Sequence, residues 1–167
     1  SITGPDPEHM VRAGIPIGDL GGGMFGVMGI LAALYERERS DVGQHVDISM
    51  LDCQISMLNY MATMHFLSGD DPYPIGNSHF VHVPYNTFTC SDGSIVIAVI
   101  TDNFWQNLKG LLKCSELDLP QYDNQPGRWE DRKMINAKLN ELLSVDTCAH
   151  WLALFEAQRI PCAPVNS

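Results

Sequence analysis

The sequence predicts a mixed α/β protein in two parts: a helix–strand–helix segment over residues 1–74 and an α+β domain over residues 75–167. Helical spacing of apolar side chains in the first part, strand-like alternation in the second and a loop rich in Gly, Asp, Asn, His and Pro between them support this division. With 45% hydrophobic and 18% charged residues, the 167-residue chain is expected to fold around a buried core.

The first predicted helix begins after Asp19. Residues 24–39 are apolar at first and charged at the end, which is typical of a helix that leaves a core. Gly26 and Gly29 within it indicate close packing against a neighbouring segment. The longest apolar run, residues 24–35, is shorter than the roughly 20 residues that span a bilayer, so we expect no membrane segment and a cytoplasmic protein.

A short strand and a second helix are expected after the first helix. Residues 44–50 alternate polar and apolar side chains, as a strand with one buried face does. Residues 51–67 place apolar side chains near helical spacing and predict one continuous helix. The loop over residues 68–84 follows, and we place the domain boundary within it.

Residues 85–100 predict a β-hairpin with a Ser-Asp-Gly turn. Helices are expected after the hairpin over residues 101–112, about 130–143 and 147–158. Thr101 or Asp102 is the expected cap of the first of these helices and Asp146 of the last. Residues 116–129 are expected to form a polar loop.

Asp19, followed closely by Gly21, Gly22 and Gly23, is the candidate functional group. The positive end of a helix favours an ionised carboxylate, and missing side chains let a substrate approach. Carboxylates also serve as covalent catalysts that divide one difficult acyl transfer into easier steps. The local pattern alone favours a simpler interpretation, in which Asp19 caps the helix.

The stretch IPIGDLGGGMFGVMGILAALYERERSDVGQHVDISMLD, residues 15–52, resembles the signature of the family III CoA-transferases, the CaiB/BaiF family. Two later stretches, IGNSHFVHVPYNTFTCSDGSIVIAV and RIPCAPVNS, resemble the same family in the same order. The resemblance implies that residues 1–74 are the C-terminal part of a large domain and residues 75–167 the small α+β domain. It also implies a fragment that lacks most of the large domain and a homodimer of interlocked subunits.

In that family an aspartate at the position of Asp19 exchanges acyl groups and CoA through an anhydride and an aspartyl-CoA thioester. A coenzyme A thioester is then a substrate, and no permanently bound cofactor is expected. The chemistry needs backbone N–H groups that stabilise the developing oxyanions, and Gly21, Gly22, Gly23 and the start of the helix are the candidate donors. Asn77, His79 and Tyr85 would line the pocket, with His79 a candidate proton carrier. A turn asparagine, a surface histidine and a core tyrosine explain these three residues equally well.

Composition argues against several other classes of protein. The formal net charge of −10 repels polyanions, so we expect no nucleic-acid partner. The cysteines form no CxxC pair, which argues against a zinc ribbon or a redox dithiol. His79 and His82, with Asp70 and Asp71, lack the spacing of a metal cluster, and we expect no metal.

Two alternatives to CoA transfer stay open. The same fold contains 2-methylacyl-CoA racemases, in which the aspartate belongs to an acid/base pair. Alternatively, the chain is a non-catalytic truncated domain that only folds or self-associates, because an exposed apolar helix surface favours association. Under either functional interpretation we expect a dimer or a higher oligomer.

Overall fold

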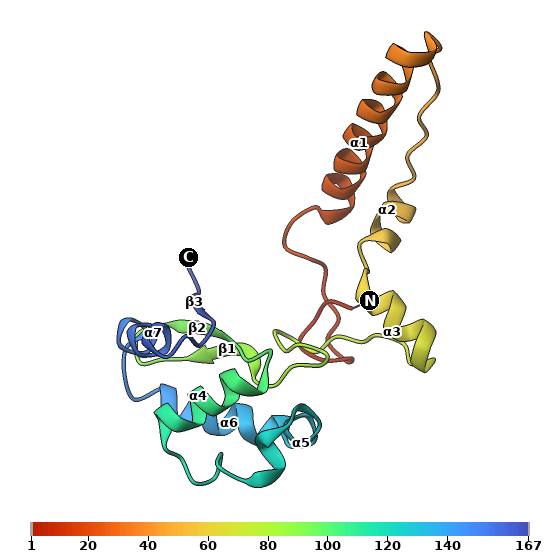
Figure 1. Cartoon of the computed structure of the whole chain (residues 1–167). Coiled ribbons are helices and arrows are strands. Elements are labelled where there is room, and N and C mark those ends of the chain that lie inside the picture. Colours follow the sequence, from red (N-terminus) through yellow and green to blue (C-terminus); the bar gives the residue numbers. More distant parts are fainter. Residues whose placement is uncertain (1, 167) are drawn as a thin grey trace. The chain divides into compact units, whose positions relative to one another are not determined.

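The computed structural model describes residues 2–166 and divides into two compact units, the first ending at Pro74 and the second beginning at Ile75 (Figure 1). The first unit is helical. The second combines a small antiparallel sheet with helices. The predicted mixed α/β class is therefore confirmed.

The first unit is built on α1 (Ile17–Ser40), which Figure 1 shows as a long helix with the chain returning along it. α1 ends at Asp41, whose φ of 58° is left-handed and whose N–H donates to the carbonyl of Arg37 at 2.7 Å. By length and composition alone α1 could cross a membrane, contrary to our expectation, because the helix begins at Ile17 rather than after Asp19. One such helix is weak support for a membrane span, since core helices of soluble proteins have the same properties.

The prediction of a strand over residues 44–50 is wrong. This segment is extended, but it pairs with no strand in the part of the chain that the structure describes, because the neighbour against which it packs is α1. A Cβ built on Gly29 would lie 2.9 Å from Cγ1 of Val46 and 3.6 Å from Cδ1 of Ile48. The expected close packing at Gly29 is confirmed, and a side chain there would displace the extended segment.

The single helix expected over residues 51–67 is two helices, α2 (Met50–Ser56) and α3 (Tyr60–Ser68). Ser49 caps α2, because its side chain accepts the N–H of Asp52 at 3.2 Å. The break between the helices lies before Asn59, whose φ of 50° is incompatible with a continuous α-helix. Apolar spacing that runs across a break of this kind does not reveal the backbone change.

In the second unit, β1 (Tyr85–Thr89), β2 (Ser94–Ala98) and β3 (Cys162–Pro164) form an antiparallel sheet in the order β1-β2-β3. β1 and β2 are the predicted hairpin, with Thr89 opposite Ser94. The C-terminal segment completes the sheet by pairing Val96 with Ala163. The hairpin prediction is confirmed because alternation and turn chemistry are both local signals.

The helices around the sheet are α4 (Asp102–Leu112), η1 (Pro120–Asp123), α5 (Gln125–Glu130), α6 (Arg132–Leu143) and α7 (Cys148–Ala157). Thr101 caps α4, as expected, by accepting the N–H of Phe104 at 3.4 Å. Asp146 is not the cap of α7, because Thr147 accepts the N–H of His150 at 3.3 Å. Asp146 instead accepts the N–H of Thr147 at 2.7 Å.

The prediction of a polar loop over residues 116–129 is wrong, since this segment contains η1 and the start of α5. Asn124 begins α5 by accepting the N–H of Gly127 at 3.1 Å, and Pro126 lies in the first turn. An asparagine cap followed by proline is a recognised helix start. The shortness of α5 removes the apolar periodicity that would have identified it.

A single core holds the second unit together. Its fully buried side chains come from β1, β2 and the surrounding helices and include Phe88, Ile95, Ile97, Trp105, Leu108, Leu139, Leu143 and Phe155. Burying each such side chain contributes about 1.5–3 kcal/mol relative to exposure. The unit therefore has an apolar core of its own, on which its loops are held.

We predict that Leu139→Ala lowers the free energy of unfolding by about 2–5 kcal/mol, because Leu139 is 0% exposed and its removal leaves a cavity. Urea titration followed by tryptophan fluorescence measures the loss. The control is Val145→Ala, at a side chain that is 77% exposed, which should change stability by less than about 0.5 kcal/mol. Equal effects of the two substitutions would contradict the core assignment.

Candidate active site

Asp19 lies in the first turn of α1, with its side chain exposed. The N-cap position is Pro16, which makes no side-chain cap hydrogen bond, so the interpretation of Asp19 as the cap is wrong. The physical reason is that the helix begins at Ile17, two residues before Asp19. A carboxylate in the first turn is stabilised by the partial positive charge of the helix N-terminus.

The start of α1 determines which backbone N–H groups remain for a ligand. The N–H of Ile17 donates to the carbonyl of Ile15 at 2.8 Å, and that of Leu20 to Pro16 at 3.0 Å. The first-turn amides that intrahelical bonding leaves over are those of Gly18 and Asp19. The amides of residues 21–23 lie beyond the first turn and follow the i to i−4 pattern of the helix.

The three glycines after Asp19 have different surroundings. A Cβ on Gly21 would lie 2.6 Å from Cε of Met57, and one on Gly22 would lie 3.2 Å from Cγ of Met50. Both glycines therefore allow α2 and its end to pack on α1. Gly23 is exposed, and a Cβ there would meet no described atom within 4 Å. The glycine run thus combines two packing positions with one open position.

His79 and Tyr85 lie together in the second unit. Their rings are stacked with centroids 5.0 Å apart, and the ring of His82 lies 4.7 Å from that of His79 on centroids. The backbone N–H of His79 donates to the carbonyl of Tyr85 at 3.2 Å. The segment before β1 is therefore folded back onto the first residue of the strand.

The hydrogen bonds of His79 indicate its tautomer. Nδ1 accepts the backbone N–H of Val81 at 3.0 Å and that of His82 at 3.2 Å, so the proton of the neutral ring is on Nε2. Burial, with a smaller contribution from the charge of His82, lowers the pKa of His79 below its ordinary 6.5. The geometry favours a neutral ring that donates from Nε2 over a proton carrier that uses Nδ1.

Asn77 lies in a turn ahead of this cluster. The N–H of Ser78 donates to the carbonyl of Ile75 at 3.3 Å, and Gly76 has the left-handed φ of 65°. The Asn77 side chain is exposed. Of the three residues proposed for the pocket, the structure brings together His79 and Tyr85, and it places Asn77 on the adjacent turn.

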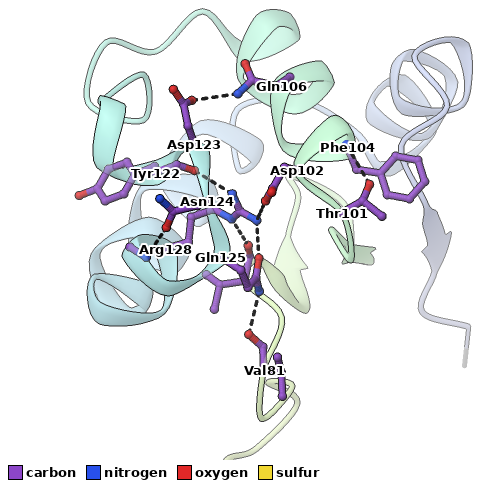
Figure 2. Close-up of polar contacts among 12 residues, drawn as sticks. Val81, Thr101, Asp102, Phe104, Gln106, Tyr122, Asp123, Asn124, Gln125 and Arg128 are labelled. Carbon is purple, nitrogen blue, oxygen red and sulfur yellow. Dashed lines mark hydrogen bonds and ion pairs between the residues drawn. The ribbon is translucent and has the colours of Figure 1, made fainter.

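Sequence reasoning missed Arg128, the buried charged residue of the second unit. Its guanidinium contacts Asp102, Gln125 and the carbonyl of Tyr122 (Figure 2). The local sequence QPGRWE gives no sign of this burial. Only the helix start at Asn124 could have shown that Arg128 lies on a short helix rather than in a loop.

Among residues 2–166, no group of three or more His, Cys, Asp or Glu side chains is arranged to hold a metal ion. The described cysteines are free thiols.

Comparison with known proteins assigns the chain to an enzyme family. The chain belongs to CoA-transferase family III, whose family model matches residues 1–167. It is 32% identical over 170 residues to the succinyl-CoA:mesaconate CoA-transferase of Haloarcula marismortui, covering 99% of the chain and 41% of that protein. It is 31% identical over 172 residues to the succinyl-CoA:glutarate CoA-transferase of Mus musculus, covering 99% of the chain and 38% of that protein.

A solved structure also supports the assignment. The chain matches the crystal structure of a CaiB/BaiF family protein from Brucella suis with a TM-score of 0.82 and 28% identity. The match covers 99% of the chain and 44% of that structure. The chain thus spans about two fifths of the length of the relatives it resembles.

We predict that His79 contributes to loss of stability in acid. Below pH 6.5 the unfolded chain binds a proton at His79 that the folded chain does not, so stability falls as the pH drops from that value toward the lower folded pKa. Urea unfolding at pH 7 and pH 5 should show a smaller fall for His79→Gln than for the wild type. The exposed His150→Gln is the control, and an unchanged fall in His79→Gln would contradict the assignment.

Proposed function

We propose that the protein transfers CoA between an acyl-CoA thioester and a carboxylic acid, with Asp19 as the nucleophile. The observation that carries this proposal is an exposed carboxylate, that of Asp19, in the first turn of α1. The sequence resemblance implies that Asp19 corresponds to the family's aspartate. Asp19 makes no side-chain cap for α1, so its oxygens are not used by the helix start. The family assignment supports the reaction class.

The chemistry proceeds through two kinds of covalent intermediate, an anhydride and a thioester of Asp19. The carboxylate of Asp19 attacks the donor thioester carbonyl, and CoA leaves as the thiolate, which gives an acyl-aspartyl anhydride. The thiolate then attacks the aspartyl carbonyl and releases the donor acid, which gives an aspartyl-CoA thioester. The acceptor carboxylate reverses both steps and regenerates Asp19. Thioester energy is conserved, so the sequence of steps needs no ATP.

Each attack creates a negative oxygen that needs hydrogen-bond donors. We assign the amides of Gly18 and Asp19 to this role, in place of Gly21, Gly22 and Gly23, because the helix start leaves these two N–H groups available. We retain Asn77, His79 and Tyr85 as candidate substrate contacts, with His79 donating from Nε2. Gly23 remains the position at which a substrate approaches α1 without a side chain in its way.

The relatives suggest the class of substrate. Two of them are named for transfer between succinyl-CoA and another dicarboxylic acid, mesaconate or glutarate. We therefore propose succinyl-CoA as the donor to test first and dicarboxylic acids as acceptors.

We predict that Asp19→Asn in the full-length protein lowers kcat by at least about a thousandfold, because an amide cannot attack the thioester. Succinyl-CoA and glutarate are incubated with the protein, and exchange is followed by chromatography. Mass spectrometry of the peptide containing residue 19 should show a CoA adduct in the wild type only. Asp52→Asn is the matched control, since Asp52 is also exposed in the first turn of a helix.

An adduct that persists in Asp19→Asn would contradict the role of Asp19. Deuterium uptake at the α-carbon of a 2-methylacyl-CoA, without exchange, would favour racemisation. If the protein shows no adduct, no exchange, no deuterium uptake and no CoA binding, the non-catalytic alternative is favoured.

We also propose a soluble, cytoplasmic protein that associates with itself through α1. The exposed apolar side chains of this helix include Leu20, Met24, Val27, Met28, Ile30, Leu31 and Leu34. An apolar surface of this extent is unfavourable in water and is normally covered by protein. Burial by protein is consistent with a charged C-terminal end that carries Arg37 and Arg39 in the last turn.

We predict that the 167-residue chain sediments as a dimer or larger at micromolar concentration. Leu31→Glu should shift it toward monomer, because Leu31 is 60% exposed on α1 and a charge there resists burial. Val145→Glu, in the second unit, should leave the sedimentation unchanged. A monomeric wild type would contradict self-association, and flotation with lipid vesicles would favour the membrane alternative.

A further inference from the structure

The segment that carries His79 is held by side chains from a distant part of the second unit. Nε of Arg128 donates to the carbonyl of Val83 at 2.8 Å. Nε2 of Gln125 donates to the carbonyl of Val81 at 2.7 Å. Both donors lie on α5, more than forty residues later in the chain, so two alternate carbonyls of one short segment are fixed by one short helix.

Arg128 and Gln125 are also joined to each other. Nη2 of Arg128 donates to Oε1 of Gln125, which leaves the amide nitrogen of Gln125 directed at Val81 (Figure 2). The same Nη2 donates to Oδ1 of Asp102 at 2.8 Å, and Nη1 donates to the carbonyl of Tyr122 at 2.7 Å. The guanidinium thus connects α4, η1, α5 and the segment before β1.

Because Arg128 is buried, its N–H groups must be hydrogen-bonded by protein acceptors. The Arg128 side chain is 0% exposed and Asp102 is 58% exposed, so the charge lies inside the unit while its carboxylate partner reaches solvent. The guanidinium carbon lies 5.3 Å from the centroid of the Trp105 ring. A buried cation needs all its donors satisfied, and the planar guanidinium does this only when each acceptor has a defined position.

His79 depends on the segment that these contacts fix. Its Nδ1 accepts the N–H groups of Val81 and His82, which belong to the same stretch as the two held carbonyls. If Val81 and Val83 moved, both donors to Nδ1 would move with them. The imidazole would then lose the hydrogen bonds that select its tautomer.

We propose that Arg128 and Gln125 are positioning residues that hold residues 81–83 so that His79 is kept neutral with its proton on Nε2. Neither residue need touch a substrate. A role of His79 in CoA transfer rests on the proposed function. The positioning of residues 81–83 by Arg128 and Gln125 does not depend on that function.

The test uses ¹⁵N chemical shifts of the histidine rings in the full-length protein, recorded as a function of pH. Arg128→Lys keeps the charge, but a single ammonium cannot reach Val83, Tyr122 and Asp102 together. Gln125→Glu keeps an acceptor for Arg128 but removes the donor to Val81. Lys138→Met is the matched control, because it removes a mostly buried cation with two carboxylate partners elsewhere in the unit.

In the wild type we expect the Nδ1 shift of an unprotonated nitrogen and a midpoint below 6.5. In Arg128→Lys and Gln125→Glu the midpoint should rise toward 6.5 and the two ring nitrogens should approach averaged shifts. Lys138→Met should match the wild type. If Arg128→Lys does not fold, Gln125→Glu decides the question.

Unchanged His79 shifts and midpoint in the folded variants, even with lower melting temperatures, would overturn the proposal and leave a purely structural role. A change in Arg128→Lys but not in Gln125→Glu would remove Gln125 from the assignment. Where the wild type transfers CoA, we expect both variants to lose about tenfold in kcat or more, with little change in KM. A wild type without transfer would overturn the proposed function but not the shifts expected for His79.

Discussion

The second unit depends on satisfying one buried positive charge. The guanidinium of Arg128 has no contact with solvent and donates to a carboxylate, an amide oxygen and two backbone carbonyls. Leaving a buried charge of this kind without its partner typically costs about 3–5 kcal/mol, a large share of the stability of a small domain. The segments that supply these acceptors must therefore meet at one place, which determines how the stretch before β1 lies on α5.

The helix starts of this chain divide into two kinds. α2, α4, α5 and α7 begin at Ser, Thr or Asn side chains that accept a backbone N–H. α1, α3 and α6 begin without such a cap, and α1 carries Asp19 exposed in its first turn. A capping carboxylate would have its oxygens engaged by the helix. The cap position of α1 is Pro16, so the helix start does not engage the oxygens of Asp19 in this way.

Local signals predicted local structure well. The hairpin, the cap at Thr101 and the packing role of Gly29 follow from alternation, turn chemistry and the missing side chain of glycine. The errors arose where the outcome depends on a partner. Residues 44–49 form no sheet but pack on a helix, and residues 51–67 retain apolar spacing across a backbone break at Asn59. Spacing reports which side chains are buried and not what covers them.

The sequence by itself determined the mixed fold class and the family, because both are carried by contiguous motifs around Asp19 and around the hairpin. It also identified the candidate carboxylate. Only the tertiary structure decided which first-turn amides of α1 lack an intrahelical acceptor, which tautomer His79 adopts and that Arg128 is buried. The first property depends on where a helix begins, and the second on a turn that directs the N–H groups of Val81 and His82 at the His79 ring. The third depends on contacts between residues more than forty positions apart, which no local pattern encodes.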